Sequence, residues 1–463
     1  MPRVFISAAH KSSGKTTVSL GLCAGLQARG HAVQPFKKGP DYIDPMWLGL
    51  AAQRPCYNLD FHMMQRAEIV QCFGDHASDA RISLIEGNKG LYDGLDLDGS
   101  NSNAALAKLL KVPVVLVIDA RGMTRGVAPL ILGYQAFDPA IHIAGVILNN
   151  LGGSRHESKL RAVIEHYTDV EVIGAVQQDA NLQIAERHLG LVPANEQHAA
   201  QQKMQQVGER IAAQVDLDRL LAIADGTANL EWDAQPAAGV TSAPLRIGIA
   251  RDRAFGFYYS EDIDTMHAAG VDLVNVDTLH DPVLPEVDGL IIGGGFPEVF
   301  MTELEANRSL REDIHTKIER GLPTYAECGG LMYLSNSIQW QNQMRQMVGS
   351  VPGNVVMHDR PVGRGYARLQ PAGDDIRAES AEIPAHEFHY SSLENMPDNA
   401  RYAYRVTRGQ GIDGVHDGYL HQNLLAGYVH RRGSGPRGWI APFLNQVRAL
   451  KEARFPSHRS KQA

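Results

Sequence analysis

The chain has 463 residues, which is too long for one hydrophobic core and predicts two large domains. Hydrophobic residues make up 44% of the chain and charged residues 21%, and no apolar run approaches the ~20 residues that cross a bilayer, so we expect a soluble protein with no membrane partner. The formal net charge of −8 argues against a nucleic-acid partner, because binding to a phosphate backbone needs a basic face.

The N-terminal segment and the cysteines predict a cytoplasmic protein. The opening MPRVFISAAHKSSGK enters a strand-like run directly, without the basic, apolar and small-residue order of a signal peptide. The four cysteines (Cys23, Cys56, Cys72 and Cys328) lack metal-ligand spacing, and a reducing compartment would keep them as thiols. We therefore expect no disulfide framework.

The order of apolar runs predicts two α/β domains in series. The β-branched runs VFIS, ISLIEG, VPVVLVIDA and IAGVILNN alternate with helical stretches, which is typical of βαβ units and a mainly parallel sheet. The same pattern restarts with LRIGIARD, VDLVNV and VDGLIIGGG. Between them, GTANLEWDAQPAAGVTSAP is rich in turn-forming and small residues. The sequence thus predicts one domain over residues 1–225, a linker at 226–244, a second domain over 245–450 and a tail at 451–463.

The segment AAHKSSGKTT has the features of a phosphate-binding loop between a strand and a helix. Such a loop needs exposed backbone N–H groups, a lysine for the β- and γ-phosphates, and a hydroxyl for Mg²⁺ at the start of the helix. Gly14, Lys15 and Thr16 fit these roles, while Ala9 stands where the full pattern has glycine. The alternative is a Gly-Lys-Thr helix start without a ligand. We favour a nucleotide site made of Lys11, Ser13, Gly14, Lys15, Thr16 and Thr17.

Carboxylates near this loop are candidate ligands for Mg²⁺. Glu86 ends the apolar run ISLIE, and a strand end in a doubly wound sheet faces the ligand crevice. Asp41 lies in the loop KKGPDYIDP, and a hard cation that keeps several waters suits one or two such carboxylates. The alternative for Asp41 is an ordinary acidic turn. Thr16, Asp41 and Glu86 are the predicted metal ligands.

The segment PTYAECGGLMYL predicts a nucleophile in the second domain. Cys328 lies between a short strand and an apolar helix start, an arrangement that resembles a nucleophile elbow. A thiol there gains thiolate character from the helix N-terminus and a nearby histidine. Upstream, Gly293 to Gly295 end a buried strand, where we expect free backbone N–H groups for an oxyanion. The alternative is a buried structural cysteine.

These motifs, in this order and spacing, resemble the cobyrinic acid a,c-diamide synthase family. That family joins an ATP-dependent amidoligase domain, similar to dethiobiotin synthetase, to a class I glutamine amidotransferase domain. The resemblance covers nearly the whole chain and is carried by these segments: SSGKTT, FKKGPDYIDP, NLDFHMM, EGNKGLYDG, VVLVIDA, GVILNN, IGIARDRAFGFYY, GGGFPE, YAECGGLMYL, HEFHYS and GYVH. It implies a phosphate-loop parallel-sheet domain followed by an α/β glutaminase domain.

The resemblance implies chemistry at two sites. Cys328 would attack the glutamine side-chain amide, His430 would serve as general base, and N–H groups near Gly294 and Gly329 would hold the oxyanion. In the first domain, ATP and Mg²⁺ would convert a substrate carboxylate to an acyl phosphate, which ammonia then attacks. His386 and His389 belong to the matching segment HEFHYS and would shape the glutaminase site, unless they face solvent on a polar strand.

The implied substrates are L-glutamine and a tetrapyrrole polycarboxylate, amidated at its a and c acetates in cobalamin biosynthesis. The family commonly has valine and methionine where EGNKGLYDG has Asn88 and Lys89, and a second histidine where this chain has Arg432. These departures keep a sirohaem amidase of the same family, acting in sulfite reductase maturation, as an alternative, and a homodimer stays open. The residues expected near the macrocycle are Lys37, Tyr42, Asp44, Lys89 and Asn101.

A rival interpretation is a partition-type or septum-positioning ATPase, a dimeric switch with a similar variant loop. In the C-terminal run FLNQVRALKEARFPSHRSK, an apolar face that contains Phe443, Val447 and Leu450 could belong to an interfacial helix or pack on its own domain. A switch leaves YAECGGLMYL and GYVH without a purpose, so we prefer the amidoligase.

Overall fold

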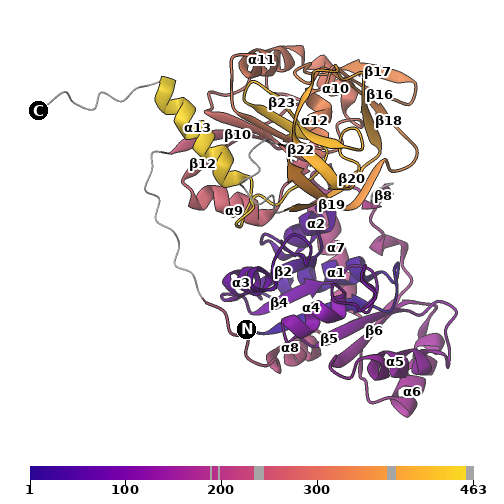
Figure 1. Ribbon diagram of the computed structural model, residues 1–463. Coiled ribbons are helices and arrows are strands. Elements are labelled where there is room, and N and C mark those ends of the chain that lie inside the picture. Colours follow the sequence, from indigo (N-terminus) through magenta and orange to yellow (C-terminus); the bar gives the residue numbers. More distant parts are fainter. Residues whose placement is uncertain (188–189, 197–198, 234–243, 373–381, 455–463) are drawn as a thin grey trace, which may run out of the picture. The chain divides into compact units, whose positions relative to one another are not determined.

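The computed structural model describes residues 1–187, 190–196, 199–233, 244–372 and 382–454. The chain forms two compact units, Met1–Pro236 and Ala237–Ala463, each built around its own sheet (Figure 1). Much of the predicted linker at 226–244 and most of the predicted tail at 451–463 lie outside the described residues. Among the described residues, no helix combines the length and apolarity needed to cross a membrane.

A parallel sheet of seven strands organises the first unit. Its strands are β1 (Arg3–Ala8), β2 (Val33–Lys38), β3 (Tyr57–Leu59), β4 (Ile82–Glu86), β5 (Val114–Asp119), β6 (Ile143–Leu151) and β7 (Val172–Gln177). Their order is β3-β2-β4-β1-β5-β6-β7, so β1 lies between β4 and β5. The carboxyl ends of these three strands border the crevice where doubly wound sheets bind ligands. The predicted parallel α/β domain is confirmed.

Helices connect these strands, and two further helices follow β7 in the chain. The connecting helices are α1 (Lys15–Ala28), α2 (Ile43–Ala52), α3 (Arg66–Ala77), α4 (Asn103–Leu109), α5 (Val127–Phe137) and α6 (Ser154–Tyr167), and the two that follow β7 are α7 (Ala200–Ala212) and α8 (Leu217–Asp225). Short elements lie between β7 and α7: η1 (Ala180–Leu182), β8 (Glu186–Arg187), β9 (Gly190–Leu191) and η2 (Ala194–Glu196). Helix α1 packs closely on α7, since a Cβ on Gly21 would lie 2.2 Å from Ile211 Cγ1.

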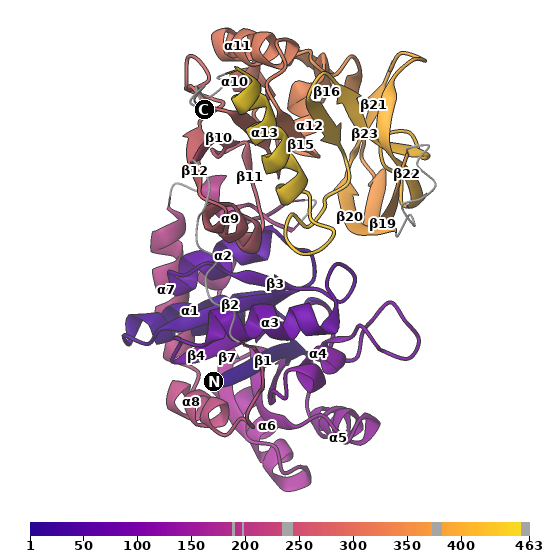
Figure 2. The same ribbon diagram turned by 60° about the vertical axis from the view of Figure 1, so that its left-hand side comes forward.

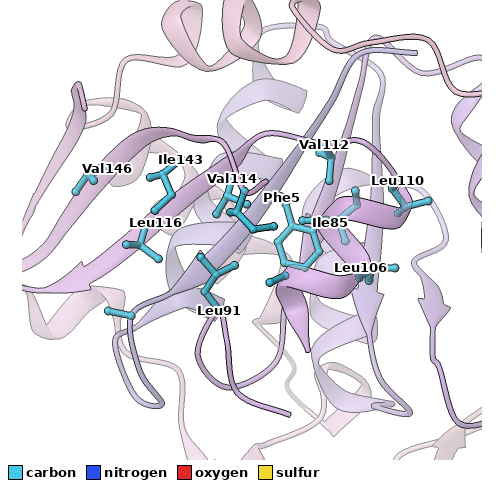
Figure 3. Close-up of a cluster of buried hydrophobic side chains, with 14 of the residues drawn as sticks. Phe5, Ile85, Leu91, Leu106, Leu110, Val112, Val114, Leu116, Ile143 and Val146 are labelled. Atoms are coloured by element: carbon cyan, nitrogen blue, oxygen red, sulfur yellow. The ribbon is translucent and has the colours of Figure 1, made fainter. Parts of the chain in front are cut away.

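A continuous apolar core fixes the sheet against α3 to α6 (Figure 3). Phe5 from β1, Ile85 from β4 and Leu116 from β5 are fully buried beside Leu106 of α4. Each such side chain contributes roughly 1.5–3 kcal/mol when it leaves water. Because adjacent strands supply these side chains, the core also fixes the positions of the strand ends that carry the polar residues of the crevice.

The second unit contains a sheet of nine strands in the order β12-β10-β13-β15-β24-β23-β22-β19-β20. The first five are parallel and the rest antiparallel. The strands of this sheet are β10 (Leu245–Ala250), β12 (Val271–Val276), β13 (Gly289–Ile292), β15 (Thr324–Glu327), β19 (Gly363–Pro371), β20 (Ile383–His389), β22 (Arg401–Arg408), β23 (His416–His421) and β24 (Leu424–Gly427). Smaller sheets use β11 (Phe255–Phe257), β14 (Gly294–Gly295), β16 (Ser337–Trp340), β17 (Gln343–Gln346), β18 (Asn354–Met357) and β21 (Ser391–Glu394).

Helices cover both faces of the parallel part of this sheet. They are α9 (Ser260–Ala268), α10 (Met301–Ala306), α11 (Arg308–Glu319), α12 (Gly329–Leu334) and α13 (Ile440–Arg454). Side chains of α10, α11 and α12 share one buried cluster with the sheet, and those of α9 and α13 share another (Figure 2). Phe443 and Val447 of α13 lie in the second cluster, so the apolar face of this helix packs on its own unit. The alternative of an interfacial helix is therefore wrong for Phe443 and Val447, which pack as the second alternative predicted.

Candidate active sites

The phosphate loop follows β1 and ends at Gly14, directly before α1. Gly14 has a φ of 79°, a left-handed conformation that glycine adopts without strain. A Cβ at this position would lie 2.1 Å from Nδ2 of Asn149, a residue of β6. Asn149 Nδ2 in turn donates a hydrogen bond to the Ser13 carbonyl at 2.9 Å. The glycine therefore allows β6 to clamp the loop.

Glu86, at the end of β4, is the centre of a buried charge cluster. Its Oε1 accepts hydrogen bonds from Lys15 Nζ at 2.6 Å, Thr16 Oγ1 at 2.8 Å and Lys37 Nζ at 2.9 Å. The sheet register explains the arrangement, because Lys37 on β2 pairs directly with Glu86. Lys37 also forms a hydrogen-bonded ion pair with Asp44. The structure thus brings two of the predicted loop residues, Lys15 and Thr16, into one cluster with the predicted crevice residues Lys37, Asp44 and Glu86.

The two lysines keep Glu86 ionised although its exposure is 0%. Burial alone would raise the pKa of the Glu86 carboxyl, but Lys15 and Lys37 outweigh it and lower the pKa to about 2. Burial lowers the pKa of Lys15, and Glu86 opposes that effect. Burial also opposes the charge on Lys37, yet Asp44 and Glu86 raise its pKa well above the ordinary value. Glu86 and Lys37 therefore stay charged at neutral pH.

The donor atoms at this cluster fit a magnesium ion bound together with nucleotide phosphates. Glu86 Oε2 is buried and has no hydrogen-bond partner in the part of the chain that the structure describes. Asp41 is nearby, 3.9 Å from Lys37 Nζ, with a side chain that is 36% exposed. Among the described residues, no cluster of three His, Cys, Asp or Glu side chains could hold a metal alone. A hard cation here would share its shell with water and phosphate oxygens.

The remaining predicted substrate residues, Tyr42, Lys89 and Asn101, are not part of the hydrogen-bonded cluster around Glu86. Tyr42 is buried at the start of α2, and Lys89 is exposed on a loop with a φ of 36°. Asn101 accepts from the Leu95 N–H at 2.8 Å and donates to Asp96 at 2.7 Å, so it organises its own loop. Lys11 and Lys89 both extend into solvent from the loops at this edge of the sheet.

Two residues near the crevice were missed at the sequence level. Lys38 is buried, its Nζ lies 3.3 Å from Asn88 Oδ1, and burial lowers its pKa to about 8. The Lys37-Lys38 pair at a strand end was the available signal for this residue. Asn149 belongs to the matching segment GVILNN, but its clamping of the phosphate loop was not apparent because its partner lies 136 positions away in the chain.

In the second unit, Cys328 lies in a sharp turn between β15 and α12. Its φ of 49° is a strained conformation for a non-glycine residue, as expected for a nucleophile elbow. The Cys328 N–H donates to the Gly427 carbonyl of β24 at 2.7 Å. Both following glycines are sterically required, because a Cβ on Gly330 would lie 2.1 Å from the Ile292 carbonyl oxygen. The predicted strand, turn and helix start are all present.

His430 lies beside the Cys328 thiol, which it contacts through a side-chain hydrogen bond. Strand β24 ends at Gly427, so His430 lies beyond this strand, in an isolated β-bridge with His386. His430 is held instead by two backbone hydrogen bonds with His386, of 3.0 Å and 2.7 Å, and their rings stack at 4.9 Å. Cys328 is 7% exposed and His430 3% exposed.

The surroundings of His430 favour its protonated form. Burial lowers the pKa of the imidazole, but Cys328 and then Glu327 outweigh burial and raise it to about 10. Nδ1 of His430 lies 3.4 Å from Oε2 of Glu327, the residue directly before the cysteine. An imidazolium beside a thiol stabilises the thiolate, which is the nucleophilic form.

The predicted oxyanion glycines lie close to this pair. A Cβ on Gly294 would be 2.8 Å from His430 Cε1, and one on Gly329 would be 2.9 Å from the Gly295 nitrogen. As the first residue of α12, Gly329 has an N–H without an acceptor in the same helix. Gly293 is different, because its N–H donates to the Tyr258 hydroxyl at 2.9 Å. The expectation that all three glycines have free N–H groups is wrong for Gly293.

His386 and His389 both point into the protein, so the solvent-facing alternative is wrong for them. The His389 ring stacks on Tyr428 at 4.1 Å, and its Nδ1 contacts the Ser391 carbonyl at 2.8 Å. Nδ1 of His386 lies 3.3 Å from the Tyr259 hydroxyl. These rings form the wall of the site around the segment that carries His430.

Arg432, the residue that departs from the family pattern, anchors the loop after His430. Its guanidinium binds both carboxylate oxygens of Glu261, at 3.0 Å and 2.7 Å. Asp262 accepts from the backbone N–H groups of Gly433 and Ser434 at 2.9 Å and 3.0 Å. The start of α9 therefore fixes this loop, a role that the sequence did not reveal.

Comparisons with known proteins identify the family of each unit. Residues 5–192 match the CobQ/CobB/MinD/ParA nucleotide binding domain, and residues 246–434 match the CobB/CobQ-like glutamine amidotransferase domain. A cobyrinate a,c-diamide synthase of Magnetococcus marinus is 47% identical over 96% of this chain and 96% of its own. The cobyrinate a,c-diamide synthase of Methanosarcina acetivorans is 42% identical over 98% of this chain and 97% of its own, and that of Archaeoglobus fulgidus is 40% identical over 93% and 94%. With this identity along almost its whole length, the chain belongs to the cobyrinate a,c-diamide synthase family.

Proposed function

We propose that the protein is a glutamine-hydrolysing, ATP-dependent amidoligase that amidates the a and c acetates of cobyrinate. The observation that carries the proposal is the buried pair of Cys328 and His430 at a strained elbow, in a chain that also holds the Lys15–Glu86 phosphate-loop cluster. A nucleotide switch does not need the cysteine–histidine site, whereas a glutamine-dependent amidoligase needs both this site and the phosphate loop.

In the glutaminase unit, the Cys328 sulfur attacks the side-chain carbonyl carbon of glutamine. His430 accepts the thiol proton and delivers it to the departing amide nitrogen, which leaves as ammonia. Backbone N–H groups at Gly294 and Gly329 hold the oxyanion of the tetrahedral intermediate. Water then hydrolyses the thioester, glutamate leaves, and the thiol is restored.

In the first unit, backbone N–H groups of the phosphate loop and the Lys15 ammonium bind the ATP phosphates. Thr16, Glu86 and Asp41 would hold Mg²⁺, which supplies charge neutralisation at the phosphates when bound. Lys15 then exchanges its contact with Glu86 for the β- and γ-phosphates. A substrate carboxylate takes the γ-phosphoryl group, and ammonia displaces phosphate to leave an amide.

The predicted substrate residues give this site its selectivity for a polycarboxylate. Lys37 and Lys89 of the predicted set, together with Lys38, which was not predicted, are cationic groups at one edge of the sheet, and lysine pairs with carboxylates. Tyr42, Asp44 and Asn101 stay predictions as contacts of the macrocycle. A cytoplasmic location and a homodimer are likewise predictions from the sequence and from the resemblance.

A mass spectrum of the products tests the proposal. The protein would be incubated with ATP, Mg²⁺ and glutamine, with cobyrinic acid in one tube and sirohaem in another. We expect two exchanges of a hydroxyl for an amino group in the cobyrinic acid tube. Conversion of sirohaem alone would assign the protein to the alternative branch, and conversion of neither substrate would contradict the proposed chemistry for both.

A further inference from the structure

Glu327 directly precedes the nucleophile and is 7% exposed. Two donors fix one of its oxygens, because Oε1 accepts from the Tyr325 hydroxyl at 2.5 Å and from the Arg431 N–H at 3.1 Å. The other oxygen, Oε2, faces His430 Nδ1 at 3.4 Å. The carboxylate is thus oriented from one side and presents its second oxygen to the imidazole.

The strained turn explains how two adjacent residues reach the same imidazole. Successive side chains of a strand point to opposite faces, so Glu327 and Cys328 would diverge if β15 continued. The left-handed conformation of Cys328, with a φ of 49° and a ψ of −103°, redirects its side chain. As a result the Cys328 thiol contacts the ring whose Nδ1 faces Glu327.

The neighbouring carboxylates already have other functions. Position 432, two residues after His430, is occupied by an arginine that is bound to Glu261. Asp262 accepts the backbone N–H groups of Gly433 and Ser434. These two acids hold the loop after His430, while Glu327 is aimed at the ring itself.

We propose that Glu327 is the positioning residue that completes Cys328 and His430 as a triad. Its Oε2 accepts the Nδ1–H of His430, which directs Nε2 to the Cys328 sulfur and stabilises the imidazolium. Nε2 holds the proton of Cys328 while the bond between sulfur and the amide carbon forms. The carbon–nitrogen bond then breaks, and the same proton moves from Nε2 to ammonia. Glu327 orients the ring and exchanges no proton. The inference rests on the proposed glutaminase activity.

The substitution Glu327→Gln separates this role from a purely structural one. A glutamine side chain keeps the volume and a carbonyl oxygen that can accept from Tyr325 and Arg431. It loses the negative charge and offers an N–H₂ group to Nδ1, which favours the tautomer with a proton on Nε2. We expect the kcat for glutamine hydrolysis to fall at least about 100-fold with little change in KM, because the corresponding change in a Ser-His-Asp triad costs more. Amidation with ammonium salt should be unchanged.

Glu327→Asp serves as the conservative variant, since it retains the charge on a shorter side chain. We expect Glu327→Asp to hydrolyse glutamine faster than Glu327→Gln, even if both are less stable than the parent. A Glu327→Gln kcat within about 3-fold of the parent, or an aspartate variant no faster than the glutamine variant, would overturn the inference.

The pH dependence of Cys328 alkylation by iodoacetamide provides a second readout. The titratable groups that face His430 are Cys328, Glu327 and His386, and Tyr259 faces His386 in turn. Without the Glu327 charge, the imidazolium of His430 loses stabilisation and assists attack by the Cys328 sulfur less effectively. Alkylation at pH 7 should therefore be slower in Glu327→Gln, and an unchanged pH profile would contradict the proposed role.

Cys328→Ala, assayed in parallel, distinguishes failure of this inference from failure of the proposed function. If Cys328→Ala still hydrolyses glutamine, the proposed glutaminase function fails whatever Glu327 does. If Cys328→Ala is inactive while Glu327→Gln keeps its rate, only the positioning role of Glu327 is overturned.

Discussion

Lys37 and Glu86 are direct neighbours across strands β2 and β4, and their side chains meet at 2.9 Å in the interior. Lys37 also binds Asp44, so its ammonium neutralises two carboxylates. Removing one partner of a buried ion pair leaves an uncompensated charge. A substitution of Lys37 therefore tests whether this buried charge cluster is formed in the folded protein when no nucleotide is bound.

Lys37→Met should lower the free energy of unfolding of the first unit by about 3–5 kcal/mol. The measurement is urea unfolding without nucleotide, followed by a probe in the first unit. Lys108→Met is the matched control, because Lys108 pairs with Asp138 at 2.6 Å but its side chain is 46% exposed. We expect the control to cost about 0–1 kcal/mol. Equal effects of the two substitutions would show that the Lys37 cluster is not buried as described.

Gly14→Ala should abolish nucleotide binding as well as lower stability. Alanine would adopt a left-handed conformation at a cost of about 1–2 kcal/mol, and its Cβ would collide with Asn149. Gly30→Ala is the control, because Gly30 has a φ of 81° but no atom within 4 Å of an added Cβ. The control should show the conformational cost alone and bind ATP as the parent does. Normal ATP affinity of Gly14→Ala in calorimetry would contradict the clamp by Asn149.

Asp417 should make the stability of the second unit fall as the pH rises from about 4 to 7. Burial raises the pKa of Asp417 to about 7, although it accepts from the backbone N–H groups of Tyr428 and Val429. A raised pKa means that the folded state binds the proton more tightly, so the stabilisation is full below the unfolded pKa and is lost by pH 7. The loss amounts to about 2–4 kcal/mol.

The check for Asp417 is the slope of unfolding free energy against pH in the parent and in Asp417→Asn. In the asparagine variant, the free energy of unfolding should not show this decrease as the pH rises from about 4 to 7. Asp413→Asn is a control of opposite sign, because hydrogen bonds from His416 and nearby backbone N–H groups outweigh burial and lower the pKa of Asp413. Identical slopes for the parent and Asp417→Asn would contradict the raised pKa.

Lys15→Ala should stop amidation with either nitrogen source, because Lys15 serves ATP rather than glutamine. The released glutamate, measured without ATP, should stay near the parent rate since Cys328 and His430 are untouched. Loss of glutaminase activity together with amidation would indicate a general folding defect, which a melting curve would reveal.

The sequence predicted the features that are encoded locally. Strands β1, β4, β5 and β6 follow from β-branched runs, and the phosphate loop and elbow follow from a glycine, lysine or cysteine placed between a strand and a helix. In each case a few consecutive residues determine the backbone conformation. These strands, the phosphate loop and the elbow could therefore be predicted without knowing which strands are neighbours in the sheet.

Contacts between distant segments could not be read in the same way. Lys37 meets Glu86 only because β2 pairs with β4 in a given register, and Glu327 meets a histidine 103 positions later through the order of β15 and β24. Arg432 looked like a missing site residue until its pairing with Glu261 was visible. The hydrogen bonds of Asn101 with Leu95 and Asp96 were likewise not apparent from the sequence, and its contact with the macrocycle stays a prediction. Strand register and loop closure decide these roles.

The measurement that tests the central claim most directly is amidation by Cys328→Ala with two nitrogen sources. Cobyrinic acid, ATP and Mg²⁺ would be supplied with glutamine in one reaction and with ammonium salt in the other. We predict that the variant makes no amide from glutamine but retains the parent rate with ammonium, because the acyl phosphate site needs only ammonia. Amide formation from glutamine by this variant, or loss of both activities in a folded protein, would contradict the two-site account.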